Sequence, residues 1–381
     1  MHIISHSMNH VIIYKETDTY CSFPHVVTLP SGNLAVTFRK ASKFSADAAR
    51  SGVATHHDPD SSIQIIESTD GGCTWQVDSL RTVYKSQYGV NDPAMTVLKD
   101  GSIINRFVAL DIRPAAQWNT PPAKIFSHRT EHGLVTAVVG NLVVRSRDGG
   151  VTWSEIGVDN VASIGPSCSR DPIVEMPDGS WLMPVYTGAP QRSDVSWLIR
   201  SFDEGLTWCE PIQIMSDENG RFSQLQGINY NETSLLPLGN GEMVALVRAD
   251  ATFHTENEFM PVGGVGDLCL ARSFDSGLSW SPPMRTGIWG QPGSLMRLAD
   301  GRVLATYGYR KKPFGVRCCI STDRGRTWDT ANEIVIREDC PTWDCGYPFT
   351  IQMKDGHLFT VYYFVDGEGT RHIAGTHWEL P

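Results

Sequence analysis

The stretch STDGGCTW at residues 68–75 decides the fold, because its pattern of Ser, Asp, Gly, Thr or Ser, and Trp returns four more times at irregular intervals. Such repetition indicates one supersecondary unit that is reused with loops of different length between the copies. In each copy, which we call a box, Asp can bond its own turn, Gly gives backbone freedom and Trp covers an apolar layer. We therefore expect all five boxes to be structural. The other copies are SRDGGVTW (146–153), SFDEGLTW (201–208), SFDSGLSW (273–280) and STDRGRTW (321–328).

A second repeat precedes each box and occurs once more after the last one. An apolar segment, a turn with Gly and another apolar segment form the pattern of a β-hairpin. Each box follows its hairpin after a third strand, so a unit has four antiparallel strands, as in a propeller blade. The sequence predicts an all-β, six-bladed propeller forming one domain over residues 1–381, with residues 10–14 completing the last sheet. The hairpins are PHVVTLPSGNLAVTF (24–38), PAMTVLKDGSIINRF (93–107), PIVEMPDGSWLMPVY (172–186), ETSLLPLGNGEMVALV (232–247), PGSLMRLADGRVLATY (292–307) and PFTIQMKDGHLFTVYY (348–363).

Composition narrows the class of protein. The 381 residues are 41% apolar and carry a net charge of −10, and the longest basic cluster, residues 310–312, argues against a nucleic-acid or membrane surface. The first residues are too polar for a signal peptide, and no apolar run is long enough to span a bilayer. Nine Cys without paired spacing favour reduced thiols in the cytoplasm over disulfides or a metal site. The sequence gives no indication of oligomeric state.

Four inserts are too polar or Gly-rich to be strands, and we expect them to be loops. They cover residues 41–59, 111–133, 216–226 and 251–266. In a propeller, the connections between blades and those between second and third strands emerge on one face, around the central channel. Long inserts on that face predict a ligand pocket at the channel mouth.

Five boxes on six hairpins resemble the sialidase (neuraminidase) superfamily over nearly the whole chain. In that family a Glu opens the inner strand of the fourth blade and an Arg lies across its hairpin, matching Glu232 and Arg248. A Tyr before the sixth hairpin matches Tyr347, and Arg310 resembles a carboxylate-binding Arg. A structural ion pair, a packed Tyr and a solvated Arg are the plainer interpretations of these residues.

The resemblance implies a retaining exo-glycosidase that needs no cofactor. Glu232 would take the proton of Tyr347, while Arg248 and Arg310 would hold the carboxylate of a terminal acidic sugar. An α-keto acid glycoside carries that carboxylate on the reacting carbon. A neutral phenol therefore approaches it with less repulsion than an anionic nucleophile would.

The first unit departs from the family pattern. Ser22 stands where the family has its first carboxylate-binding Arg, and Arg39 matches a sugar-contacting Arg; Arg170 is a further candidate. The acid/base group should lie in the loop before the third strand, which offers Asp58 and Asp60, and Asp58 is our choice. His56 is the alternative, since imidazole performs the same proton transfer near neutral pH. Asp58 followed by Pro is also typical of a simple turn.

We therefore expect a glycan or small acidic-sugar substrate, such as a sialic or related 2-keto-3-deoxy acid. The missing Arg at Ser22 keeps two other classes open. One is a propeller lyase or hydrolase acting on a uronic-acid or deoxy-sugar linkage, with Tyr347 and a His as base and acid. The other is a carbohydrate-binding propeller without catalysis.

Overall fold

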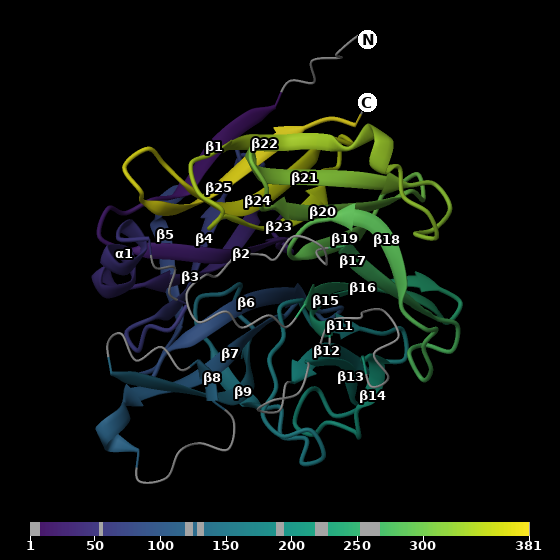
Figure 1. The fold of residues 1–381 in the computed structure, drawn as a ribbon, viewed down its shortest axis with the longest axis horizontal. Coiled ribbons are helices and arrows are strands. Elements are labelled where there is room, and N and C mark those ends of the chain that lie inside the picture. Colours follow the sequence, from purple (N-terminus) through teal and green to yellow (C-terminus); the bar gives the residue numbers. More distant parts are fainter. Residues whose placement is uncertain are drawn as a thin grey trace.

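The fold is an all-β propeller (Figure 1). A computed structural model describes residues 8–52, 56–118, 125–127, 133–187, 194–217, 228–251 and 267–380. Three sheets have four strands each, paired in chain order. They are β11 (Val174–Glu175), β12 (Trp181–Thr187), β13 (Val195–Ser201) and β14 (Ile212–Met215); β15 (Ile228–Gly239), β16 (Glu242–Ala251), β17 (Asp267–Ser273) and β18 (Met284–Trp289); and β19 (Gly293–Arg297), β20 (Val303–Tyr309), β21 (Phe314–Ser321) and β22 (Ile334–Cys340).

Two larger sheets complete the molecule. One has five strands, with the short β8 added to β9 beside the path β10-β9-β7-β6; the other has eight strands along β23-β24-β25-β2-β3-β4-β5, with β1 on β25. The five-stranded sheet consists of β6 (Val90–Val97), β7 (Ile103–Pro114), β8 (Ile125–Ser127), β9 (Leu134–Ser146) and β10 (Ser154–Val158). The eight-stranded sheet consists of β1 (Asn9–Tyr14), β2 (Tyr20–Thr28), β3 (Leu34–Ala41), β4 (Ser62–Ser68), β5 (Gln76–Lys85), β23 (Gly346–Gln352), β24 (Leu358–Val365) and β25 (Arg371–Trp378).

The eight-stranded sheet has two four-stranded halves. Strands β2 to β5 form one half, and β23, β24, β25 and β1 form the other. A single parallel bridge between Tyr20 and Arg371 joins them. The described chain therefore forms five separate sheets rather than the expected six, because this bridge merges two neighbouring units.

The first insert contains a short helix, which the sequence analysis missed. Helix α1 spans Lys43–Arg50 and packs its small side chains Ala46 and Ala49 inward. The 3-10 turns η1 (Ala115–Gln117) and η3 (Thr330–Asn332) are the other helical segments of the described chain. Within those same residues, none of the helices is long and apolar enough to cross a membrane.

The box carboxylates bond within their own turns, as the sequence predicts for structural groups. In the first box, Asp70 Oδ1 accepts hydrogen bonds from Ser68 Oγ at 2.7 Å and Thr74 N at 2.9 Å, while its Oδ2 accepts from Thr74 Oγ1 at 2.6 Å. These bonds hold the pKa of Asp70 down at about 2. The indole Nε1 of Trp75 closes the turn on the carbonyl of Gly72.

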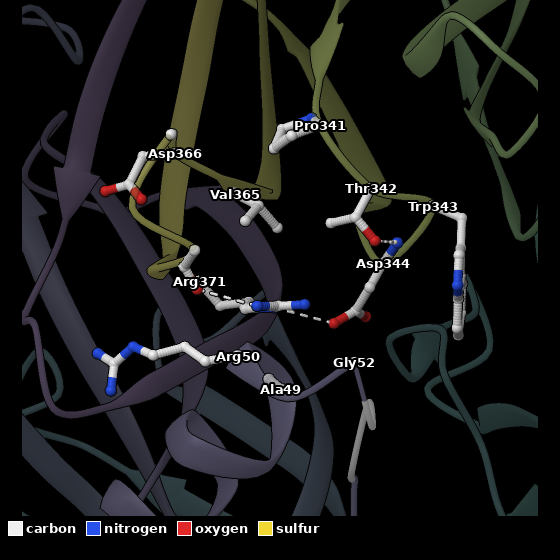
Figure 2. A pocket seen from close by; sticks show the side chains of 12 residues that line it. Ala49, Arg50, Gly52, Pro341, Thr342, Trp343, Asp344, Val365, Asp366 and Arg371 are labelled. Atoms are coloured by element: carbon white, nitrogen blue, oxygen red, sulfur yellow. Dashed lines mark hydrogen bonds and ion pairs between the residues drawn. The ribbon is translucent and has the colours of Figure 1, made fainter.

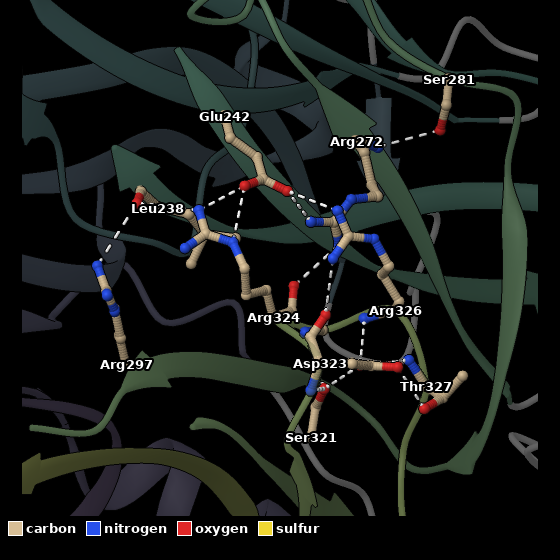
Figure 3. A network of polar contacts seen from close by, with 11 residues as sticks. Leu238, Glu242, Arg272, Ser281, Arg297, Ser321, Asp323, Arg324, Arg326 and Thr327 are labelled. Carbon is tan, nitrogen blue, oxygen red and sulfur yellow. Dashed lines mark hydrogen bonds and ion pairs between the residues drawn. The ribbon is translucent and has the colours of Figure 1, made fainter. Parts of the chain in front are cut away.

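Three arginines of one sheet donate hydrogen bonds to the box of the next sheet. Arg145, Arg200 and Arg272 each directly precede a box Ser, and each reaches the following box, at Glu204, at the carbonyl of Ser276 and at the carbonyl of Arg324. Figure 3 shows the last of these contacts, where Glu242 also accepts from Arg272 and Arg324. The boxes are therefore joints between sheets as well as turns within them.

Candidate functional site

Four inner strands share an unusual backbone feature at the same point. Phe23, Asp92, Glu232 and Tyr347 have positive φ angles of 54°, 44°, 25° and 52°. At each one the strand register shifts, which is the mark of a β-bulge. Non-glycine residues in this region cost about 1–3 kcal/mol each and cluster at functional sites, where the surroundings over-determine them. These bulges re-aim one side chain from each of four units.

Two of these side chains meet directly. The phenol of Tyr347 donates a hydrogen bond to Oε1 of Glu232, and both residues are buried, with 5% of their surface exposed. Arg248 Nη1 donates to the second oxygen of the same carboxylate. Of the residues predicted for the site, Tyr347, Glu232 and Arg248 therefore lie together.

The protonation states of this pair suit proton transfer. Burial raises the pKa of Glu232, but the charge of Arg248 and the hydrogen bond from Tyr347 outweigh it, so the pKa lies below its ordinary value. Burial and the charge of Glu232 raise the pKa of Tyr347 well above its ordinary value. A neutral phenol thus faces an ionised carboxylate, and the carboxylate can act as its base.

Two guanidinium groups of the predicted site are buried and have nitrogens without a partner among the described residues. Arg310 is 5% exposed, and its Nε and Nη2 have no hydrogen-bond partner among the described residues. Its guanidinium carbon lies 5.6 Å from the centre of the Tyr347 ring. Arg39 is fully buried, donates from Nε to the carbonyl of Val90 at 3.1 Å, and leaves Nη1 and Nη2 unpartnered within the described chain. Buried donors in this state are suited to an anionic or hydroxyl-rich ligand.

Arg170, a candidate for sugar contact, bonds backbone carbonyls of this protein instead. Its Nη1 donates to the carbonyl of Gly293 at 2.7 Å and its Nη2 to the carbonyl of Pro348 at 2.9 Å. Both terminal nitrogens are therefore engaged by backbone from two other sheets. The geometry makes Arg170 a brace across the channel, and its guanidinium also lies 5.4 Å from the Tyr347 ring centre.

Asp58, the expected acid, holds helix α1 in place. Its Oδ2 accepts from the backbone and hydroxyl of Ser42 and from Ser45 Oγ, and its Oδ1 accepts from Asp60 N. Burial raises the pKa of Asp58, but the charge of Arg39 and the serine hydrogen bonds outweigh burial. The pKa of Asp58 therefore lies below its ordinary value. A carboxylate that is ionised and saturated in this way is a poor proton donor, so the geometry does not support the choice of Asp58.

His56 lies nearer the cluster. Its ring packs edge-on against Phe23 at 4.8 Å between centroids, and Phe23 packs in turn against Tyr347 at 4.6 Å. Burial and the charge of Arg39 push the pKa of His56 well below its ordinary value. Its Nε2 is buried and has no hydrogen-bond partner among the described residues. His56 is thus a neutral imidazole, which can accept a proton but has none to give as an imidazolium.

Asp92 is the group that the sequence analysis missed. It is 8% exposed, and its Oδ1 has no hydrogen-bond partner in the described chain. Burial and the charge of Glu232 raise its pKa to about 7. Arg106 Nη1 donates to the carbonyl of Asp92 at 2.9 Å and holds the bulge. A signal was present in the sequence, since Asp92 directly precedes the Pro of the second hairpin as Tyr347 precedes that of the sixth.

The remaining expectations concern ligands and loops. Within the described chain, no group of three or more His, Cys, Asp or Glu side chains is placed to hold a metal ion. Within the part of the chain that the structure describes, none of the nine cysteines forms a disulfide. The expectation that 111–133 is a loop is wrong, because the end of β7, the turn η1 and strand β8 lie in it, where backbone pairing with β9 overrides the polar composition. Most of the inserts 216–226 and 251–266 lies outside the described residues.

Comparison with known proteins defines the family. The model of the BNR repeat-like domain matches residues 129–360, more than half of the chain, and the protein belongs to this family. Its structure is similar to that of a protein of unknown function from Dyadobacter fermentans, with a TM-score of 0.80 and 29% identity over 98% of this chain and 99% of that one. A search of curated proteins finds no match.

Sialidases share the fold at much lower identity. The NanB sialidase from Streptococcus pneumoniae has a TM-score of 0.66 and 12% identity over 97% of this chain and 70% of its own. The Trypanosoma rangeli sialidase in complex with sialic acid has a TM-score of 0.63 and 12% identity over 97% of this chain and 58% of its own. The chain is therefore a sialidase-like BNR-repeat propeller.

Proposed function

We propose that this protein is an exo-glycoside hydrolase that removes a terminal acidic sugar, a sialic or related 2-keto-3-deoxy acid, with retention of configuration. The hydrogen bond from Tyr347 to the ionised Glu232, beside arginines with unpartnered donors, carries this proposal. We count the eight-stranded sheet as two blades, which gives six blades and five boxes. Reduced cysteines favour the cytoplasm as its location.

Arg310 and Arg248 hold the sugar carboxylate in this proposal. Tyr347 Oη attacks the anomeric carbon and its proton passes to Glu232. The bond to the leaving oxygen breaks as that oxygen takes a proton from Asp92. Water then attacks the glycosyl–tyrosine, giving one proton to Asp92, while the phenolate recovers its proton from Glu232. Asp92 is preferred over Asp58 and His56 because a pKa of about 7 leaves its carboxyl substantially protonated near neutral pH.

Covalent trapping tests the proposal. Acidic sugars with fluorine at C3 and a good leaving group, built on N-acetylneuraminic acid and on 3-deoxy-D-manno-octulosonic acid, should label Tyr347 and add the mass of one glycosyl group. Tyr347→Phe is the matched control and should stay unlabelled while keeping its fold by circular dichroism. A parent protein that hydrolyses the unfluorinated glycosides without forming the adduct would rule out the retaining route.

A second candidate is elimination from a uronic-acid linkage. The neutral His56, with its unpartnered Nε2 next to Phe23, favours this candidate because an unprotonated imidazole can accept the proton that elimination removes. Elimination forms an unsaturated sugar that absorbs in the ultraviolet, whereas hydrolysis does not. Product absorbance on a panel of uronic-acid and 2-keto-3-deoxy glycosides therefore separates the two reactions, and turnover of neither class leaves carbohydrate binding alone.

A further inference from the structure

The boxes lie on the face of the propeller opposite to the Tyr347 cluster. The bulges of that cluster lie near the starts of inner strands, whereas each box follows the end of a third strand. Because neighbouring strands of a sheet are antiparallel, these two ends lie on opposite faces. The connections that line the pocket in Figure 2 join units, or second to third strands, and so belong to the site face. A partner that covers the boxes therefore leaves the site open.

Two neighbouring boxes carry exposed apolar side chains. The second and sixth positions are Phe202 and Leu206 in the third box, and Phe274 and Leu278 in the fourth. All four side chains are between 64% and 70% exposed. None of the other three boxes has apolar residues at both of these positions, which hold Thr and Cys, Arg and Val, and Thr and Arg. We call the four side chains of the third and fourth boxes the apolar ridge.

One arginine joins the two halves of the ridge. The guanidinium carbon of Arg200 lies 5.8 Å from the centre of the Phe202 ring, and its Nη2 donates to the carbonyl of Ser276 in the fourth box at 2.5 Å. The guanidinium carbon of Arg272 lies 6.0 Å from the centre of the Phe274 ring in the same way. Both aromatic rings therefore contact guanidinium groups that are held by hydrogen bonds to the boxes, and the ridge forms one continuous surface.

The acidic groups beside the ridge are already bonded within the protein. Asp203 and Asp275 accept hydrogen bonds from their own turns. Glu204 accepts from Arg145 of the neighbouring sheet. It is also the one charged residue by which the two boxes differ, because Ser276 holds the same position in the fourth box. The ridge can therefore be covered without leaving a carboxylate unpaired.

The area of the ridge approaches what an interface needs. Two Phe and two Leu side chains at this exposure present on the order of 450 Å², within the range of the largest apolar patches on monomers, which are often functional. A standard interface takes about 800 Å² from each partner, with a polar rim around an apolar centre. The ridge supplies more than half of this area before any rim is added.

The repetition within the ridge indicates a second copy of this chain as the partner. A two-fold axis that runs between the two boxes, in the plane of the contact, places the third box of one copy over the fourth box of the other. Both boxes present one Phe and one Leu, so apolar side chains meet apolar side chains on each side of the axis. Glu204 then faces the box that has Ser276, and two like charges are kept apart.

We propose that the apolar ridge is the interface of a homodimer, in which the third box of each copy packs on the fourth box of the other about a two-fold axis. The site of each copy faces away from the partner in this arrangement. The proposal does not depend on the glycosidase activity proposed above, and its test needs no substrate.

The test measures the mass of the intact protein in solution, by light scattering or sedimentation, at concentrations up to about 100 μM. The parent protein should be a dimer. Leu206→Glu and Leu278→Lys should each raise the Kd of the dimer at least about 10-fold, because each places an unpaired charge in an apolar contact. Val77→Glu is the matched control, since Val77 is 67% exposed like Leu206 but lies on β5, outside the ridge, and it should leave the Kd unchanged. A parent that is monomeric throughout overturns the proposal, as does a dimer that both ridge substitutions leave intact.

Mixing the two ridge variants tests the two-fold arrangement. In a mixed dimer the substituted positions of Leu206→Glu and Leu278→Lys lie opposite each other and pair a carboxylate with an ammonium, while the second box contact keeps its unaltered leucines. The equimolar mixture should therefore dimerise more tightly than either variant alone. Native mass spectrometry with one variant labelled with ¹⁵N identifies the mixed dimer, and circular dichroism checks that both variants keep the fold. A mixture that dimerises no better than its components overturns the proposed arrangement.

Discussion

The Tyr347 phenol donates to Glu232 although the two residues are 115 positions apart in the sequence. Each is brought to this meeting by a bulge with positive φ on the inner strand of its own sheet. The contact therefore depends on the closed arrangement of the sheets, and neither strand could form it alone.

Removing either partner of this contact should abolish most turnover. Tyr347→Phe and Glu232→Gln should each lower kcat by at least roughly 100-fold, because positioned proton transfer contributes about that much or more. The double variant should lose little further, since each group is useless without the other. Steady-state kinetics on the best acidic glycoside measure this. Effects that simply multiply would show that the two residues act separately.

The pH profile should identify the proton donor. Activity should fall as pH rises through about 7, because the raised pKa of Asp92 is where its carboxyl loses the proton it donates. The acidic limb should lie below the ordinary range of Glu, because the pKa of Glu232 is lowered. Asp92→Asn should lower kcat and remove the alkaline limb.

Asp58→Asn is the matched control for that profile. It exchanges the same atoms in a carboxylate that only anchors α1. The alkaline limb near pH 7 should remain in this variant. If Asp58→Asn removes it and Asp92→Asn does not, the assignment of the acid reverses.

Asp92 should also make the fold less stable as pH rises. Its folded pKa is raised from 3.8 to about 7, so between these values the folded state binds more protons than the unfolded state. Stability attributable to this group therefore falls as pH rises through that window. Urea unfolding at pH 5 and pH 8 should show that Asp92→Asn gains more stability at pH 8. An equal gain at both values would contradict the raised pKa.

The boxes should affect stability and not catalysis. Asp70→Ala leaves Thr74 and Ser68 without their acceptor and should lower the melting temperature, with kcat per folded molecule unchanged. Asp60→Ala, which removes only an exposed pair with Lys85, is the control and should change the melting temperature less. A large kcat loss in folded Asp70→Ala would give the box a catalytic role.

The buried contacts of Glu242 with Arg272 and Arg324 should contribute more to the free energy of unfolding than a surface ion pair does. Arg272 is 5% exposed and bonds both Glu242 and the next box, so Arg272→Met should cost roughly 1–3 kcal/mol through the acceptors left behind. Arg302→Met, which breaks an exposed pair with Asp300, should cost little. Urea unfolding compares the two variants. Equal losses of unfolding free energy in the two variants would show that the Glu242 contacts contribute no more than the surface pair.

Features encoded in short repeated stretches could be predicted from the sequence, whereas features that depend on contacts in space could not. Boxes and hairpins are written in short stretches, so the all-β propeller could be predicted from Asp, Gly and Trp spacing. Tyr347, Glu232 and Arg248 could be placed together because each matches one position of a family pattern. The function of Asp58 could not be predicted, because its partners are Ser42, just before α1, and Ser45 within α1, and the signal for this helix is a few small residues.

The properties of Asp92 and Arg170 also depend on residues that are distant in the sequence, and they could not be predicted from it. A raised carboxyl pKa depends on burial and on Glu232, which comes from another sheet. Arg170 is a candidate for substrate binding by residue type, yet its acceptors are the carbonyls of Gly293 and Pro348, and the positions of carbonyl groups cannot be predicted from side-chain identity.

The pairing of β1 with β25 has a consequence for how the chain is made. His10 and Thr376, which are hydrogen-bonded across these strands, lie 366 positions apart. During translation β1 emerges first, and its partner is synthesised only after all the other sheets. Until then β1 is an unpaired strand, and unpaired edges invite pairing with other chains. Synthesis of β25, rather than growth of any single sheet, therefore sets the earliest moment at which the ring can close.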